Sequence, residues 1–128
     1  MRALVDTCAF LWMLTNSGNI SPKARSVLAD PDNELFFSAA SGWEMAIKVR
    51  LGRLVLEGDI ERLIPEQMHK LSIHPLPVVH AHALRTASLK PHHRDPFDRL
   101  LIAQAQIENL PIVTPDFVFR KYGIALIW

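Results

Sequence analysis

The feature of this sequence that most restricts its fold is a set of short apolar runs separated by segments of helical period. The runs lie at residues 2–5, 35–37, 73–76, 111–113 and 124–127. They do not show the regular alternation of apolar and polar residues that is typical of a half-exposed strand. Strands that are buried on both faces of a parallel sheet have this kind of sequence. The chain is therefore expected to contain such a sheet.

The segments between these runs predict helices at residues 7–14, 22–29, 42–51, 59–71, 78–89 and 97–109. Ser21 followed by Pro22, and Ser41 before the third segment, are typical helix starts. Gly52 is a typical helix end. Pro65 lies inside the fourth helix, and whether it divides that helix in two is left open. The alternation of strands and helices predicts a three-layer α/β/α fold with a parallel sheet of four or five strands. We expect residues 1–128 to form a single domain.

Composition excludes several classes of protein. The 14 Lys and Arg residues nearly balance the 13 Asp and Glu residues, so the net charge of +1 excludes a generally basic nucleic-acid coat. Cys8 is the only cysteine, which excludes an internal disulfide and favours a reducing compartment with Cys8 in the core. Asp6 interrupts the apolar N-terminus, and no apolar stretch has the length of a membrane span. We expect a soluble, cytoplasmic protein with no membrane contact.

Four acidic residues fall where the expected strands end or the following helices begin. They are Asp6, Glu44, Asp98 and Asp116. In open α/β sheets, ligand sites form beyond the carboxyl ends of the strands. All four acids are therefore expected at the same edge of the sheet.

A single acidic residue near a helix start usually caps the helix or interacts with its dipole. Four acids at one edge are harder to explain in this way, because unit charges about 4 Å apart repel by ~4 kcal/mol at an effective dielectric constant near 20. Protonation or a bound cation must relieve that repulsion. Oxygen ligands, with no compact His or Cys spacing, favour Mg²⁺ or Mn²⁺ over structural zinc.

Four motifs in this order resemble those of PIN-domain nucleases, and more narrowly those of VapC-type toxins from toxin–antitoxin pairs. The motifs are residues 4–7 (LVDT), 38–48 (SAASGWEMAIK), 93–105 (HRDPFDRLLIAQA) and 112–116 (IVTPD). The resemblance covers essentially the whole chain. Each motif is weak alone, but four in the right order are specific.

The resemblance implies roles for individual residues. Asp6, Glu44, Asp98 and Asp116 match the acidic quartet of the family, which binds metal and is catalytic. Thr7 and Thr114 match the hydroxyl residues that commonly flank the quartet. Pro115 departs from the many relatives that have a backbone N–H at this position, which puts the placement of Asp116 in question. Asp95, present in one branch of the family, is expected to fix the loop or support the metal ligands.

The function implied by the resemblance is metal-dependent hydrolysis of RNA phosphodiester bonds, with Mg²⁺ or Mn²⁺ as the cofactor. The implied partners are an RNA substrate and a cognate antitoxin, in a homodimer or a toxin–antitoxin hetero-oligomer. Part of an early apolar segment is expected to line the antitoxin groove or a dimer contact; its members are Phe10, Leu11, Trp12 and Leu14.

Basic and hydroxyl residues near the acids are candidates for binding substrate. They are Thr7, Lys48, Arg94, Arg99 and Thr114. Lys48 lies one helical turn after Glu44, so a phosphate contact and a surface ion pair with Glu44 are equally open. The same two interpretations apply to both arginines. His92 and His93 lie in an expected loop; a substrate contact is open to them, although exposed loop histidines usually have no specific role.

Two other classes of function remain open at this point. One is a catalytically silent PIN-like module that binds RNA or protein, against which the complete quartet argues. The other is a phosphoryl-accepting receiver domain, which also gathers acids around Mg²⁺. A receiver needs a lysine late in the fold, and Lys121 is poorly placed for that role.

Overall fold

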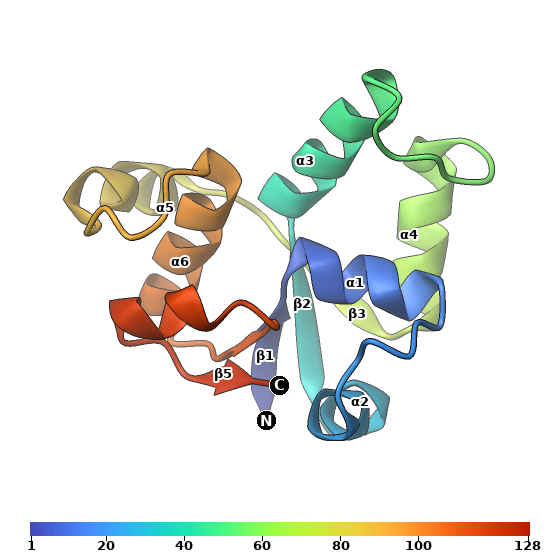
Figure 1. The fold of residues 1–128 in the computed structure, drawn as a ribbon, viewed down its shortest axis with the longest axis horizontal. Helices are drawn as coiled ribbons and strands as arrows, with labels where there is room; N and C mark the ends of the chain where they lie inside the picture. The colour runs from blue at the N-terminus through green and yellow to red at the C-terminus, as the bar shows by residue number, and fades with distance from the viewer.

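The computed structural model describes residues 1–128, and its five strands form one parallel sheet in the order β3-β2-β1-β4-β5 (Figure 1). The strands are β1 (Arg2–Val5), β2 (Glu34–Ser38), β3 (Ile73–Leu76), β4 (Ile112–Val113) and β5 (Leu126–Ile127). The α-helices are α1 (Thr7–Leu14), α2 (Pro22–Ala29), α3 (Ala39–Arg50), α4 (Ile60–Lys70), α5 (His80–Arg85) and α6 (Pro96–Glu108). Two 3₁₀ helices, η1 (Thr86–Ser88) and η2 (Phe117–Tyr122), complete the fold.

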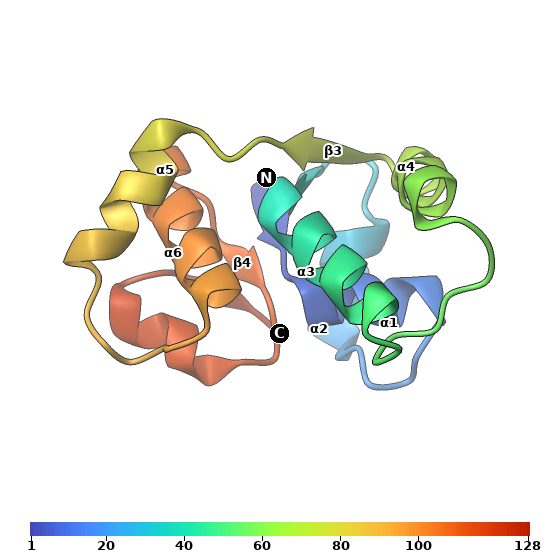
Figure 2. The same ribbon diagram turned by 90° about the horizontal axis from the view of Figure 1, so that it is seen from above.

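The sheet has a hydrophobic core on each face, which confirms the predicted three-layer architecture. Ala3 and Val5 of β1 pack into one core, with residues of α1, α2 and α4. Leu4, between them, packs into the other core, with residues of α6 and η2. Figures 1 and 2 show these two groups of helices on opposite sides of the sheet. Both faces of the central strand are buried, so its sequence is apolar at every position inside the sheet.

The direction in which successive strands are added to the sheet reverses between β1 and β4, although all the strands are parallel. From β1 the chain passes outward through β2 to β3, and then returns to add β4 and β5 on the other side of β1. At such a switch point the connections leave the two neighbouring strands in opposite directions, which opens a crevice beyond their carboxyl ends. Asp6 directly follows β1, and Asp116 lies three residues beyond the end of β4.

Capping side chains fix where the helices begin. Asp6, Ser21, Asp59 and Asp95 cap α1, α2, α4 and α6, and each accepts a hydrogen bond from a backbone N–H of the first turn. The predicted start of α3 at Gly42 was wrong. Ser38 is the cap, because its hydroxyl oxygen accepts from the Ala40 N–H at 3.0 Å, and the helix therefore begins directly after β2.

The question left open at Pro65 is answered by an unbroken α4, whose apolar residues pack on the core. Two further segments differ from the predictions. The predicted helix over 78–89 is shorter, because the Thr86 and Ser88 hydroxyls donate back to backbone carbonyls and the chain tightens into η1. No element was predicted over 117–122, where η2 forms. None of the helices combines the length and the apolar character needed to cross a membrane.

Candidate metal centre

Asp6 lies at the switch point, where its position is fixed by the fold on three sides. One carboxylate oxygen accepts a hydrogen bond from the Ala9 N–H at 2.7 Å, and the neighbouring Thr114 side chain acts to lower the pKa of this carboxyl group. The residue is only 7% exposed. Asp6 therefore caps α1 and at the same time presents a carboxylate at the end of β1, so the capping role and the predicted site role coexist.

Asp116 reaches the same place from the loop that follows β4. Its N–H donates to the Thr114 hydroxyl at 3.1 Å, and its carboxylate accepts from the Val118 N–H at 3.0 Å at the start of η2. Pro115 lies in the wall of the same pocket and does not turn Asp116 away from it. Thr114 is fully buried, so it fixes the backbone of Asp116 through its hydroxyl and has no surface for a substrate contact.

Glu44 approaches from α3, where two neighbours hold its carboxylate. The Thr7 hydroxyl donates to Oε1 at 2.8 Å, and Lys48 Nζ lies 3.0 Å from Oε2. The ion pair proposed between Glu44 and Lys48 is therefore present in the structure. Thr7 and Lys48 both line the pocket while they fix the orientation of Glu44.

Asp98 lies in the first turn of α6, whose N-cap is Asp95. Asp95 accepts hydrogen bonds from the N–H groups of Phe97 and Asp98, so its role is to fix the loop and the start of the helix, as expected. This cap leaves the carboxylate of Asp98 free to point into the pocket rather than back onto its own helix.

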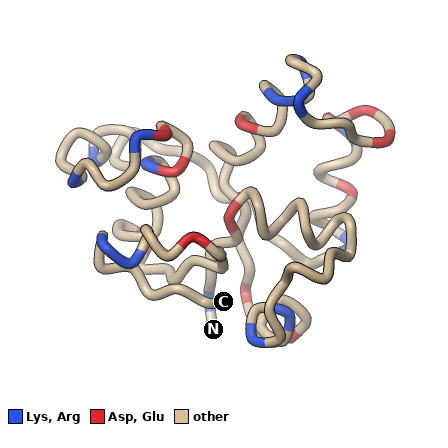
Figure 3. Tube along the Cα trace, in the orientation of Figure 1, with Lys and Arg blue, Asp and Glu red and all other residues tan.

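The four predicted acids line one pocket of about 430 Å³. They come from the ends of β1 and β4 and from the first two turns of α3 and α6. Figure 3 shows acidic segments of the chain at these places around the middle of the molecule. The remaining walls are formed by Thr7, Cys8, Leu11, Trp12, Lys48, Pro115 and Phe119. Cys8 is thus half-buried in the wall of the pocket and not in the core, and burial raises the pKa of its thiol.

Burial and mutual repulsion change how two of these acids bind protons. Burial raises the pKa of Asp6 to about 6, against the lowering effect of its hydrogen bonds with Thr114 and Ala9, and the charges of Asp116 and Glu44 add to the rise. Burial also raises the pKa of Asp98 to about 7, with the charges of Asp95, Glu44, Asp116 and Asp6 as further causes. The pocket therefore retains protons unless another cation neutralises it.

The residues present fit a divalent cation. Carboxylate oxygens are the ligands that Mg²⁺ and Mn²⁺ prefer, and here they come from four segments that are distant along the chain. Their raised pKa values show that the pocket lacks positive charge, although Lys48 reaches Glu44. A bound divalent ion supplies that missing charge in the most compact form.

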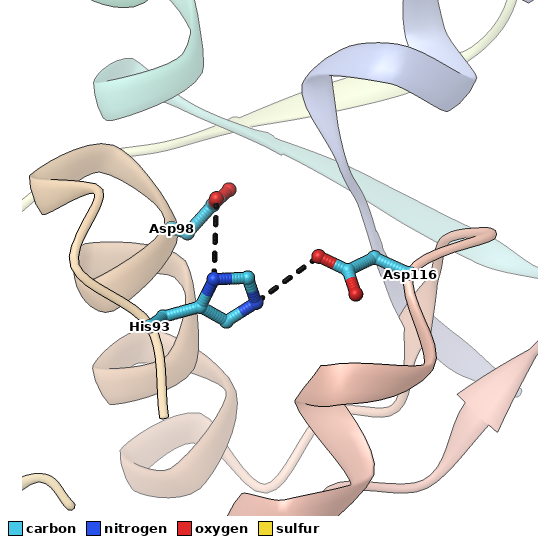
Figure 4. Close-up of side chains that lie close together, drawn as sticks. All are labelled: His93, Asp98 and Asp116. Atoms are coloured by element: carbon cyan, nitrogen blue, oxygen red, sulfur yellow. Dashed lines mark ion pairs between the residues drawn. The ribbon is translucent and has the colours of Figure 1, made fainter. Parts of the chain in front are cut away.

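His93 is a residue of this site that the sequence analysis missed. Its ring lies between Asp98 and Asp116, with Nδ1 3.7 Å from Asp98 Oδ2 and Nε2 3.0 Å from Asp116 Oδ2 (Figure 4). One donor atom from each of these three residues lies within 4.8 Å of the others. The only sequence signal was the position of His93 five residues before Asp98.

Arg99, a candidate for a substrate contact or an ion pair, instead uses its guanidinium group within the protein. Its guanidinium group donates to the backbone carbonyls of Thr86, Leu89, Lys90 and His93 at 2.8–3.2 Å. Arg99 therefore holds the loop before α6 together and lies outside the pocket wall. Arg94 is exposed and is also absent from that wall.

We expect replacement of Arg99 by Met to lower the free energy of unfolding by about 1–3 kcal/mol, since four carbonyl partners lose their donor. Thermal denaturation with circular dichroism measures the change. Arg94→Met is the matched control and is expected to stay within about 0.5 kcal/mol of the wild type. Equal stability of the two variants would show that the hydrogen bonds from Arg99 to the four backbone carbonyls do not stabilise the fold.

The receiver-domain interpretation does not agree with this arrangement. Lys121 lines a separate pocket with Arg85 and Gly123, and no lysine late in the fold reaches the four acids. The lysine that does reach them is Lys48 of α3, which pairs with Glu44.

Comparisons with known proteins agree with the fold. A family model described as the PIN domain matches residues 3–125. A segment of 70 residues is 40% identical to Ribonuclease VapC16 of Mycobacterium tuberculosis (strain ATCC 25618 / H37Rv). That segment covers 54% of this chain and 50% of the length of the relative.

Solved structures show the same fold over nearly the whole chain. VapBC2 from Rickettsia felis, bound to a DNA fragment from its promoter, matches with a TM-score of 0.70 and 16% identity, over 98% of this chain and 97% of that one. FitAcB from Neisseria gonorrhoeae matches with a TM-score of 0.61 and 19% identity, over 98% of this chain and 96% of that one. FitAB bound to the IR36 DNA fragment matches with a TM-score of 0.63 and 19% identity, over 98% and 93%.

Proposed function

This chain belongs to the PIN domain family, and we propose that it is a metal-dependent endoribonuclease that acts as the toxin of a toxin–antitoxin pair. The observation that carries the proposal is the gathering of Asp6, Glu44, Asp98 and Asp116 around one pocket at the switch point of the sheet. The likeness of half the chain to a protein named Ribonuclease VapC16 supports RNA as the substrate.

The proposed ligands of the metal are the four carboxylates of the pocket. Asp6 is the central one, because the end of β1 and the cap of α1 hold it rigidly. A bound Mg²⁺ or Mn²⁺ supplies Lewis-acid chemistry, which lowers the pKa of a water molecule and neutralises charge on the phosphate oxygens. Without it, four carboxylates would repel the phosphate of the substrate.

The other residues of the pocket orient the ligands and the substrate. Thr7 and Lys48 hold the Glu44 carboxylate, and the buried Thr114 hydroxyl accepts from the Asp116 N–H and so fixes the backbone that carries Asp116. The N-terminus of α6 adds the positive end of a helix dipole next to Asp98, which favours an anionic phosphate group there. Lys48 is half-exposed and is the proposed cationic contact for a second phosphate.

Sequencing of RNA 5′ ends after expression of the protein in bacteria tests the proposed function. We expect new 5′ ends at a restricted set of sites with the wild type, and none of them with Asp98→Asn. If the protein is instead a catalytically silent module, the wild type and Asp98→Asn should give the same RNA 5′ ends. New ends that persist in Asp98→Asn would mean that this pocket is not their source.

We also propose that a cognate antitoxin covers the pocket, on the side formed by α1. Leu11 and Trp12 are half-buried and line the pocket beside Asp6, so they offer apolar contacts next to a negative cluster. Phe10 is not part of this surface, since it is fully buried and stacks on Phe37 with the ring centroids 4.0 Å apart. An antitoxin segment with apolar residues and one basic side chain matches both features.

Purification from the native host at natural expression level, followed by light scattering, tests the antitoxin proposal. We expect a complex whose mass exceeds that of a monomer and which contains a second protein. A monomer with no second protein would contradict it.

A further inference from the structure

His93 has a ring nitrogen that the protein itself does not satisfy. The side chain is 14% exposed, and its Nε2 atom is buried without a hydrogen-bond partner. Asp116 Oδ2 is 3.0 Å away, but the contact lacks the alignment of a hydrogen bond. A buried nitrogen that is close to a carboxylate oxygen and yet not bonded to it is unfavourable, unless both atoms bind a third partner.

The spacing of these atoms is that of neighbouring ligands on one metal ion. Two ligand atoms at about 2.1 Å from an octahedral ion, at right angles to each other, lie about 3 Å apart. His93 Nε2 and Asp116 Oδ2 have this separation. Asp98 contributes a third donor atom within the 4.8 Å span of the group, and the three side chains point toward one another (Figure 4).

The ring of His93 is held firmly in this position. The backbone N–H of His93 donates to the Tyr122 hydroxyl at 2.7 Å, and its carbonyl accepts from Arg99 at 3.0 Å. The ring also packs on Phe119, with the centroids 5.0 Å apart. Its other nitrogen, Nδ1, lies 3.7 Å from Asp98 Oδ2, so the ring remains next to both carboxylates of the group.

We propose that His93 is a nitrogen ligand of the divalent ion in this pocket, so that the site prefers a first-row transition metal such as Mn²⁺ over Mg²⁺. The inference rests on the proposed metal-dependent function and adds one ligand to its carboxylates. An imidazole nitrogen binds transition metals well, whereas Mg²⁺ takes oxygen ligands almost exclusively. The histidine therefore raises affinity for Mn²⁺ far more than for Mg²⁺.

Pulsed electron paramagnetic resonance of bound Mn²⁺ tests this ligand directly, because a coordinated imidazole nitrogen modulates the electron spin echo. The variant is His93→Phe, which keeps a planar ring for packing on Phe119 and removes both nitrogens. His92→Phe is the matched control, since His92 is exposed and is not a member of the group of donor atoms formed by His93, Asp98 and Asp116. Calorimetry with Mn²⁺ and with Mg²⁺ on the same three proteins gives the affinities.

We expect nitrogen modulation in the wild type and in His92→Phe, and its loss in His93→Phe. The Mn²⁺ affinity of His93→Phe should fall about 10- to 100-fold, and its Mg²⁺ affinity by less than about threefold. Bound Mn²⁺ without nitrogen modulation in the wild type overturns the inference and leaves the RNA cleavage experiment unaffected. Unchanged or tighter Mn²⁺ binding by His93→Phe also overturns it, since the ring then competes with the ion. Absence of Mn²⁺ binding by the wild type overturns the carboxylate site as well.

Discussion

Replacement of Asp98 by Asn should abolish RNA cleavage and at the same time stabilise the metal-free protein. Cleavage should fall at least about 10²–10³-fold, because the pocket loses one of the charges that hold the ion against the phosphate. Stability should rise because a carboxylate whose pKa is raised to about 7 is unfavourable in the folded protein when it is ionised at pH 8.

The gain in stability is smaller than the pKa of Asp98 alone suggests. The side chain is 32% exposed, so solvent screens part of the repulsion, and we expect a gain of about 1 kcal/mol. In a chain of this length, that raises the melting temperature by about 3–5 °C. An opposite sign for the two effects distinguishes a functional acid from a structural one, whose loss lowers both stability and activity.

Single-turnover cleavage of a substrate RNA and thermal denaturation at pH 8 in the presence of a chelator measure the two effects. Asp59→Asn is the matched control, because it makes the same chemical change at a helix N-cap outside the pocket. It should leave cleavage within about threefold of the wild type, since Asn caps a helix as well as Asp does. Wild-type cleavage by Asp98→Asn would contradict the assignment of the pocket.

The metal-free protein should lose stability as the pH rises from 5 to 8, and a divalent ion should restore it. Asp6 and Asp98 have pKa values of about 6 and 7 in the folded protein, against 3.8 in the absence of their surroundings. Between pH 4 and 7 the folded state therefore holds more protons than the unfolded state, and stability falls with rising pH. By about pH 8, one unit above the folded pKa of Asp98, both acids are charged in either state and the loss is nearly complete.

Melting curves between pH 5 and 8, with a chelator or with saturating Mn²⁺, measure this effect. Ion at 100 times its dissociation constant should raise stability at pH 8 by about 2.7 kcal/mol, and by less at pH 5, where protons compete. The informative quantity is the difference between the profiles of the wild type and of Asp98→Asn, whose profile should be flatter. Identical pH profiles for the two proteins would contradict the proposal that the pocket holds a proton on Asp98 when no metal ion is bound.

Sequence reasoning was most successful where a position along a strand or helix determines a position in space. Asp6 follows a run that is apolar on both faces, so its place at the edge of the sheet follows from the strand itself. The same argument applied to Asp98 in the first turn of α6. Because parallel strands end at one edge, these acids could be placed together before any coordinates were known.

The residues that sequence reasoning misplaced depend on contacts between segments far apart in the chain. His93 reaches Asp116 because Tyr122 and Arg99 shape the loop before α6, and neither interaction leaves a periodic signal in the sequence. Arg99 was expected at the substrate because of its charge, but four carbonyls already use its donors.

Local signals also failed where two residues of the same type compete. Ser38 and Ser41 are equally good N-caps by composition, and only the end of β2 at Ser38 decides between them. Phe10 was expected among the exposed apolar residues of α1, yet it is the residue of that helix that faces the sheet. Periodicity shows that a helix has an apolar side, but the neighbouring strands decide which residues it buries.

Calorimetric titration of Mn²⁺ at pH 6.5, repeated in two buffers that differ in ionisation enthalpy, tests most directly whether the four carboxylates form one cation site. The pKa values of Asp6 and Asp98 predict release of about one proton for each protein that binds metal. Asp98→Asn should bind more weakly and release distinctly fewer protons. A heat of binding that is the same in both buffers, or no binding by the wild type, would contradict a shared carboxylate site.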